Sequence, residues 1–434
     1  MMAGCASTPN IGNSKVAGPV AKVDGKKFLI RDSNGDWTES FLNGVDLGAA
    51  KAGYFPGEFG IKKDDYLRWF QEISDMNVQV IRVYVTQMPT FYEALLEFNK
   101  KTQQPLYLME GVYVNEALVS QYNDAYGGDG ALKESFQADI QNAVDVIHGN
   151  IQIEKVAGNA GGNYCADVSQ WVIGWILGIE WPTEFVIGTN ESHPEMTSFQ
   201  GTYAQAENAS PFEVFLAETA ETAVSYEMKK YAQQRPVALS NWATTDPLEH
   251  PNEPNPDMED AVSIDTEHIT ATNAFEAGFF ASYHIYPYYP DFLSYDTKYL
   301  SNENQNPYLA YLTELNAHHA VPVIISEYGI PTSRGIAHKN AVTHMSQGYA
   351  TEEQQAQWII SMNKDLQASG CAGGFIFSWQ DEWFKRTWNT ADYENPERRP
   401  YWMNVESPEE CFGLLAFEPG KKDALVKVDG DDSE

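Results

Sequence analysis

The feature that most constrains the fold is a repeated alternation of short apolar runs with longer helical stretches. Each run is rich in aliphatic and aromatic residues and ends in a polar or glycine-containing loop, as buried parallel strands do. Eight runs follow this pattern, at residues 41–48, 78–87, 105–111, 171–181, 236–242, 279–287, 321–329 and 373–380. Apolar residues three and four apart predict helices between them, including 63–76, 132–150, 211–234 and 352–369. The alternation predicts an α/β fold with a parallel sheet covered by helices.

Eight such units fit a closed (β/α)8 TIM barrel better than an open sheet, since typical barrels run from about 200 to over 400 residues. Ahead of the first unit, Asn34-Gly35 stands between two strand-like runs and predicts an N-terminal β-hairpin. Long loops follow three strands, at 182–210, at 243–278 and from residue 381 on. Because these loops leave the C-terminal ends of the strands, we expect them to wall a cleft there.

Charge limits the partners of the chain. The 61 Asp and Glu residues against 28 Lys and Arg residues give a net charge of −33 at pH 7. This charge repels nucleic acid and anionic membrane surfaces, so a neutral partner is expected. The four cysteines have no metal-ligand spacing, and no His-x-His motif ends the first strand. We therefore expect neither a metal nor another cofactor.

Two of the predicted strands end on a carboxylate. Glu180 closes "WILGIE" and Glu327 follows "VIIS". A buried strand tolerates an ionised carboxylate only at its open end, where partners or a ligand offset the desolvation cost. In the predicted order these are strands four and seven, which face each other across the mouth of a barrel. Paired carboxylates across a cleft are what glycoside cleavage requires, one as proton donor and the other as nucleophile.

With these two residues the chain resembles clan A of the glycoside hydrolases, and within it most closely the barrel domains of families 2 and 5. The resemblance spans residues 40–390, with specific motifs at the strand ends. It implies a retaining (β/α)8 enzyme with Glu180 as the acid/base and Glu327 as the nucleophile.

The same resemblance implies roles for four further residues. Arg82 in "IRVY" is expected beside the nucleophile, which should stay ionised there. His284 and Tyr286 stand two apart on strand six and so share one face, from which the tyrosine would hold the nucleophile. His284 would contact the sugar or orient Glu180; the alternative is a core histidine bonded to backbone. Trp379 in "FIFSWQ" would stack against the reacting sugar.

One position departs from the clan. The clan usually has Asn before the acid/base Glu, where it binds the sugar 2-hydroxyl, but this chain has Ile179. Asn241 or Asn43 is a candidate substitute. Glu184 is a second candidate acid, although a strand end fixes a proton donor better than a loop does.

Aromatic residues also crowd the predicted loops, and pyranose rings stack on such planes. Trp181 and Trp242 are the candidate substrate-binding residues among them. The others are Tyr283, Tyr288, Tyr289, Trp383, Phe384, Trp388 and Trp402. Ordinary packing is the alternative for each. His338 would face the cleft or lie near a helix N-cap.

The expected function is that of a retaining β-glycoside hydrolase acting on a neutral β-linked polysaccharide such as a β-glucan or mannan. The site residues predicted for it are Glu180, Glu327, Arg82, Asn241, Trp242, His284, Tyr286, Trp379 and Trp181. Two alternatives stay open: a transglycosylase that uses the same intermediate, and a barrel that binds glycans without cleaving them.

The ends of the chain differ from its centre. Residues 1–25 are polar and small and predict a flexible tether ahead of a barrel domain over 26–420. "MMAGC" resembles the end of a bacterial lipoprotein signal, which implies an extracellular or periplasmic protein, lipid-anchored to the outer membrane through Cys5; an accidental match is the alternative. Residues 421–434 predict an acidic linker or the start of a truncated carbohydrate-binding domain.

Overall fold

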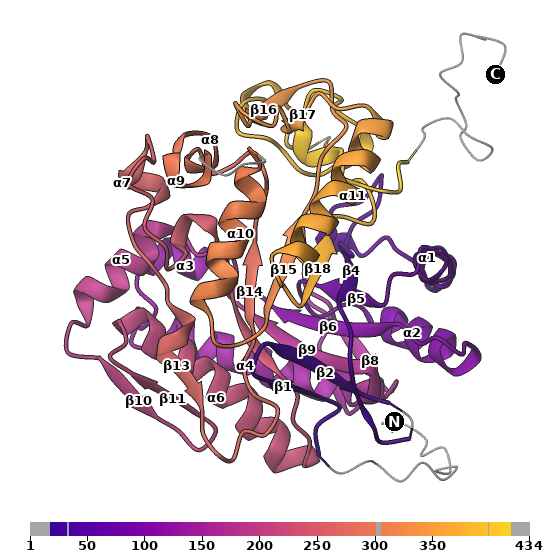
Figure 1. Cartoon of the computed structure of the whole chain (residues 1–434). Helices are drawn as coiled ribbons and strands as arrows, with labels where there is room; N and C mark the ends of the chain where they lie inside the picture. Colours follow the sequence, from indigo (N-terminus) through magenta and orange to yellow (C-terminus); the bar gives the residue numbers. More distant parts are fainter. Residues whose placement is uncertain (1–17, 33, 301–304, 398, 418–434) are drawn as a thin grey trace, which may run out of the picture.

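The computed structural model describes residues 18–32, 34–300, 305–397 and 399–417. Eight parallel strands form a closed barrel in the order β12-β14-β15-β18-β4-β5-β6-β9 (Figure 1). The strands are β4 (Leu42–Asp46), β5 (Val80–Val83), β6 (Tyr107–Val112), β9 (Val172–Leu177), β12 (Val237–Trp242), β14 (Ala281–His284), β15 (Val323–Tyr328) and β18 (Gly373–Ile376). Seven of them lie within the predicted apolar runs, and β6 extends one residue beyond its run, to Val112. The predicted (β/α)8 barrel is confirmed.

Helices surround this barrel. The long ones are α1 (Lys63–Asp75), α2 (Pro89–Lys101), α4 (Ala131–Ile147), α6 (Pro211–Tyr231), α10 (Pro307–His318) and α11 (Glu352–Ala368), and the short ones are α3 (Glu116–Tyr122), α5 (Thr183–Ser192), α7 (Pro256–Glu259), α8 (Phe292–Tyr295) and α9 (Thr297–Leu300). Local signals set their starts. At α6, the Ser210 hydroxyl accepts a hydrogen bond from the Glu213 amide, and Pro211 occupies the first turn.

The N-terminal hairpin closes the bottom of the barrel. It is part of a three-stranded antiparallel sheet of β1 (Ala21–Asp24), β2 (Lys27–Arg31) and β3 (Trp37–Glu39). Phe28 packs edge-on against Phe280 at 5.5 Å and joins the cluster of residues that fills the barrel interior. With one end plugged, the opposite, C-terminal end is left for a site.

The first strand begins earlier in the chain than expected. Ala21–Asp24 forms β1, with Ala21 fully buried, so the predicted tether over 1–25 extended too far into the fold. Cys5 and residues 421–434 lie outside the described residues. In the described part of the chain, no helix combines the length and the apolar character needed to cross a bilayer.

Two of the three long loops do not wall a cleft, contrary to expectation, except for Ala243 at the start of the second one. They supply β10 (Ser198–Gln200), β11 (Ala204–Glu207) and β13 (Ile269–Ala271), which form one antiparallel sheet. The sheet packs on α6, where Glu221 accepts hydrogen bonds from the Tyr203 and Ala204 amides. Burial of this apolar sheet face against α6 draws both loops to the outside of the barrel. A further hairpin, β7 (Ile151–Ile153) with β8 (Gly162–Tyr164), lies elsewhere on the surface.

The third loop, after β18, does form a wall. It lies against the hairpin of β16 (Ile336–Lys339) and β17 (Ser346–Gly348), which follows β15. Backbone hydrogen bonds join them, from Arg334 to Val405 and from Thr332 to Cys411. The loop and the hairpin therefore form one unit over the C-terminal end of the barrel (Figure 1).

Candidate active site

A cavity of about 600 Å³ opens at the C-terminal ends of the barrel strands, a size typical of ligand-binding pockets. Its lining includes both candidate catalytic carboxylates, Glu180 and Glu327, and the two residues predicted on strand six, His284 and Tyr286. Side chains from β15, from the segments after β9 and β14, and from the loop after β18 therefore meet at one place.

Glu327 belongs to β15 and is almost fully buried. Its Oε2 accepts a hydrogen bond from the Tyr286 hydroxyl at 2.8 Å, as the sequence predicted. Its Oε1 accepts a second one from the Tyr84 hydroxyl, also at 2.8 Å. Tyr84 was missed, although it stands two residues after Arg82 and shares its face of the strand.

Arg82 lies beside Glu327, as predicted. Its Nη1 is 3.3 Å from Glu327 Oε1 and donates to the Ser326 carbonyl at 3.0 Å. Burial favours the protonated carboxyl, but the charges of His284 and Arg82 and the Tyr84 hydrogen bond outweigh it and lower the pKa of Glu327. This carboxylate is thus held ionised. Asp46, 3.7 Å from the same Nη1, behaves differently, because burial raises its pKa well above the ordinary value.

Replacement of Tyr84 by Phe is expected to move the acid limb of kcat/KM upward by about one pH unit. The change removes a hydrogen bond to the charged form of Glu327, and such bonds contribute about 1.5–3 kcal/mol. Tyr288→Phe is the matched control, because that hydroxyl approaches the Gly329 carbonyl and not Glu327. An acid limb that stays in place in Tyr84→Phe would contradict the assigned role.

Arg82→Met is expected to destabilise the fold by about 3–5 kcal/mol, because it leaves the Glu327 carboxylate buried without the Arg82 cation. Urea unfolding measures the change. Arg68→Met on α1 is the control: Arg68 is 57% exposed, and its loss should change the unfolding free energy by no more than about 0.5 kcal/mol. Equal stabilities of the two variants would show that the buried cation is not needed.

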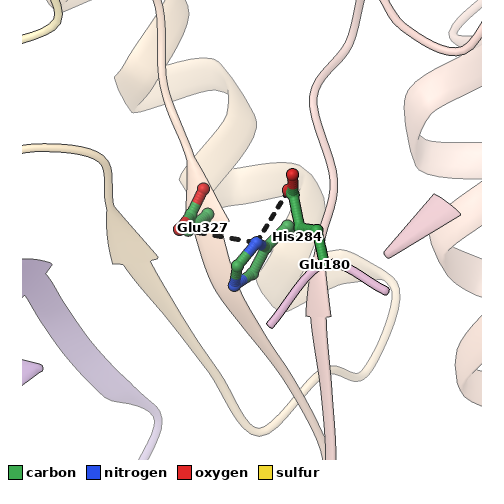
Figure 2. A group of neighbouring side chains, drawn as sticks. All are labelled: Glu180, His284 and Glu327. Atoms are coloured by element: carbon green, nitrogen blue, oxygen red, sulfur yellow. Dashed lines mark hydrogen bonds and ion pairs between the residues drawn. The ribbon is translucent and has the colours of Figure 1, made fainter. Parts of the chain in front are cut away.

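Glu180 faces Glu327 across His284. Figure 2 shows the imidazole between the two carboxylates, with Nδ1 2.8 Å from Glu180 Oε1 and 3.4 Å from Glu327 Oε1. One carboxylate oxygen of each glutamate and a ring nitrogen all lie within 4.8 Å of one another. His284 is therefore no backbone-bonded core histidine. Glu180 itself lies three residues beyond the end of β9, and its side chain is 40% exposed, so it sits in the loop and not at the strand end as expected.

The residues proposed to compensate for Ile179 do not reach the cavity. Ile179 lines it, but Asn241 is fully buried and uses its amide on the Ile264 carbonyl, the Trp242 amide and the Thr245 hydroxyl. Asn43 is bonded to Asn363. Since neither asparagine lines the cavity, no substitute for the clan asparagine comes from them.

Glu184, the second candidate acid, is on α5 and exposed to solvent. The structure describes every residue around Glu184, and Glu184 is not among those that line the cavity. Glu180 is the carboxyl that meets Glu327.

The predicted aromatic platforms are placed differently. Trp379 is 4% exposed and lies in the hydrophobic core, and Trp181 is fully buried, with its Nε1 on the Ser240 carbonyl. Neither tryptophan lines the cavity, so the prediction that each contacts a sugar there was wrong. Phe377, two residues before Trp379, lines the cavity, as does Trp242.

Other aromatic residues also separate into two groups. Those that line the cavity are Tyr288, Tyr289, Phe384 and Trp388, whereas Tyr283, Trp383 and Trp402 do not. His338 lines it too, but from β16 and not from a helix N-terminus. Its Nε2 accepts a hydrogen bond from the Trp388 indole at 3.3 Å.

A charged group on the cavity wall was missed by sequence reasoning. Lys385 Nζ is 2.9 Å from Glu382 Oε2 and 3.8 Å from Glu409 Oε2, and Gln347 donates to Glu409 Oε1 at 2.6 Å. Burial opposes the charge of Lys385, but Glu382 and Glu409 raise its pKa above the ordinary value. Its ammonium lies over the Phe377 ring at 4.2 Å, on the Glu327 side of the cavity. These polar groups are suited to sugar hydroxyls. Their only sequence signal was their place in a long loop.

Three donor atoms within 4.8 Å, on Glu180, His284 and Glu327, have the types that a metal ion binds. Here, however, Glu327 already faces the Arg82 cation and two tyrosine hydroxyls, and Glu180 Oε1 is bonded to His284. Both carboxylates thus have hydrogen-bonding partners, whereas the buried Nε2 of His284 has none among the described residues.

Comparisons with known proteins place this architecture. No family model matches the sequence, and no curated protein is similar to it in sequence. Among solved structures, the endo-1,4-beta-mannanase from Rhizomucor miehei has a TM-score of 0.50 at 12% identity, covering 82% of this chain and 90% of that one. The exo-beta-1,4-mannosidase Op5Man5 from Opitutaceae bacterium strain TAV5 has a TM-score of 0.50 at 12% identity, covering 91% of this chain and 59% of that one. At the level of the fold, these two structures resemble the (β/α)8 barrel of this chain.

Proposed function

We propose that the chain is a retaining β-glycoside hydrolase. The observation that supports this most directly is the carboxylate pair, since oxygens of Glu180 and Glu327 lie within 4.8 Å of each other across the cavity. Carboxyl groups of retaining pairs are about 5–5.5 Å apart, whereas inverting pairs leave about 6.5–9.5 Å for a water. The environments of the two glutamates also differ, because Glu327 is buried and held ionised while Glu180 is partly exposed.

In the first step, a Glu327 oxygen attacks the anomeric carbon and the glycosidic bond breaks. Oε2 is the freer oxygen, because it accepts one hydrogen bond, from Tyr286, whereas Oε1 faces Arg82, Tyr84 and His284. Glu180 gives its proton to the departing glycosidic oxygen, which leaves as an alcohol. The products of this step are a glycosyl ester on Glu327 and an ionised Glu180.

In the second step, water attacks the same anomeric carbon. Glu180 takes a proton from the water, the ester bond breaks, and Glu327 regains its charge. Two inversions give net retention. His284, bonded to Glu180 Oε1, fixes the orientation of that carboxyl in both steps.

The net charge of the chain and the residues that line the cavity indicate the substrate class. With a net charge of −33, the chain disfavours anionic polymers, and aromatic planes in the cavity suit neutral pyranose rings. The two solved structures above are named for action on β-1,4-linked mannosides. We therefore place β-mannan and β-glucan first among the substrates. Polysaccharide substrates fit an extracellular or periplasmic protein, as the N-terminal sequence implied.

A transglycosylase would use the same first step, with a sugar hydroxyl in place of water in the second. The other alternative, a barrel that binds glycans without cleaving them, is favoured by one observation: Ile179 occupies the position of the clan asparagine and lines the cavity.

A panel of β-mannans, β-glucans and xylans tests the three functions. Products are separated by size, and the anomer formed first is identified by NMR. Release of β-anomers supports retention by hydrolysis. Products longer than the substrate would indicate transglycosylation, and binding without any release would favour the non-catalytic barrel. Release of α-anomers would contradict the double displacement.

A further inference from the structure

Exposed aromatic side chains gather on the loop after β18. Seven Trp or Tyr side chains of the described residues are exposed, and four of them lie within fifteen residues of one another in sequence: Trp388 (70%), Tyr393 (90%), Tyr401 (56%) and Trp402 (77%). Both exposed tryptophans of the described chain are among them. Exposed apolar patches of this kind are uncommon on monomeric proteins and mark interaction surfaces.

The loop that carries these rings is held by specific contacts. The Gly53 amide donates to the Pro400 carbonyl, and the Arg399 guanidinium lies over the Phe55 ring at 5.8 Å. Glu394 Oε1 accepts hydrogen bonds from Thr390 and Asn404, both at 2.8 Å, which ties the loop to itself. Residues 399–402 are thus placed beside 53–55, where Tyr54 is a fifth exposed ring.

We define the aromatic rim as Tyr54, Tyr393, Tyr401 and Trp402. These four rings lie outside the cavity lining, on chain segments that also contribute to it. Pro56, two residues after Tyr54, lines the cavity, and Trp388 lines it from the other end of the loop. A long chain that leaves the cavity along these segments would therefore meet the rim.

We propose that the aromatic rim is a second glycan-binding surface, which holds a neutral β-linked polysaccharide outside the catalytic cavity. The identity of the chain rests on the proposed function. Tyrosine and tryptophan offer large apolar faces that stack on pyranose rings, and their polar edges stay in water. An anionic polymer is disfavoured by the charge of −33. The rim would thus favour polymers over short oligosaccharides as substrates.

The test measures binding in the Glu327→Gln background, where cleavage is removed. Affinity electrophoresis in soluble β-mannan and in mixed-linkage β-glucan compares the parent with a Tyr401→Ala/Trp402→Ala variant. Loss of two stacking rings is expected to weaken binding of at least one polymer about fivefold or more. Tyr295→Ala, which removes an exposed tyrosine on α8 outside the rim, is the matched control and should change binding less than about twofold.

A second readout uses the Glu327-containing enzyme. The ratio of kcat/KM on polymer to that on a small aryl glycoside should fall at least about fivefold in the rim variant. Unchanged polymer binding in a folded rim variant would overturn the proposal. So would a dimer, seen by sedimentation, that the rim variant abolishes while polymer binding is kept, because the rim would then bind a second copy.

The proposal can fail separately from the proposed function. If the wild type cleaves nothing but the rim variant loses polymer binding, the rim is supported and catalysis is not. If the wild type cleaves polymer and the rim variant binds and cleaves it equally well, catalysis is supported and the rim is overturned. Absence of both binding and cleavage in the wild type would overturn both.

Discussion

Glu327→Gln is expected to lower kcat/KM on the best polysaccharide of the panel by about 10⁴-fold or more, because the amide cannot form the glycosyl ester. The shape of the side chain is kept, Tyr84 can still donate to the amide oxygen, and the amide NH2 can donate to the Tyr286 hydroxyl. The variant should therefore fold and still bind glycan. Product release measured at high enzyme concentration, with circular dichroism as a check on folding, gives the comparison.

The matched control is Glu110→Gln. Glu110 is also a fully buried carboxyl on a barrel strand, but it bonds to Tyr92 and does not line the cavity. Burial raises its pKa to about 8, so at neutral pH an amide replaces a mostly protonated carboxyl. Its activity should stay within about threefold of the wild type. Comparable losses in both variants would mean that Glu327 acts through the fold and not as the nucleophile.

Glu180→Gln is expected to lower kcat/KM on the natural polysaccharide by about 10²–10⁴-fold, the usual contribution of a general acid. A dinitrophenyl leaving group departs without a proton. With such an aryl glycoside, the rate of the first step should therefore fall much less in Glu180→Gln. Azide should then restore turnover, since it attacks the glycosyl ester without base assistance and gives a β-glycosyl azide. Measurement of burst and steady-state rates separates the two steps.

Glu184→Gln serves as the control for this prediction. Glu184 is an exposed carboxyl four residues further along, on α5 and outside the cavity lining. Its replacement should leave all rates within about twofold of the wild type. A large loss in Glu184→Gln with normal rates in Glu180→Gln would exchange the two roles.

Most of the barrel could be predicted because its strands and helices have local signals. The four helices predicted by apolar spacing end within three residues of their observed ends, as at α11, where Thr351 and Gln354 form a capping box. The eight strands are nearly continuous apolar runs, which is typical of parallel strands buried on both faces. Glu327 followed from its place at a strand end, and Arg82 and Tyr286 followed from the resemblance to a family with motifs at those strand ends.

Side-chain positions beyond the end of a strand could not be predicted, because the sequence does not show where the strand ends. β18 ends at Ile376, earlier than expected. Phe375 fills the barrel interior, Phe377 lines the cavity, and Trp379 turns into the core, where its amide donates to the Asp46 carbonyl. In the sequence, these three alternate residues have the same strand pattern, so nothing local distinguishes the one that lines the cavity.

Long-range contacts account for the other differences. Glu110 has the same strand-end appearance as Glu327, but Tyr92 on α2 accommodates it outside the cavity. Lys385 and Glu409 stand 24 residues apart in the sequence and meet only because the loop after β18 folds back along the β16–β17 hairpin. Residue types in such a loop do not reveal these partners.

Mass spectrometry can test whether Glu327 is the nucleophile of a retaining mechanism. The protein is first treated with 2-deoxy-2-fluoro-β-glycosyl donors of the mannose and glucose series that carry a dinitrophenyl leaving group. Fluorine at C2 slows both steps, and the good leaving group lets the first one proceed, so the ester accumulates. We expect one fluoroglycosyl unit on the peptide that contains Glu327, and none in Glu327→Gln. An adduct on another residue, or no adduct from any donor on protein that cleaves the polysaccharide, would contradict it.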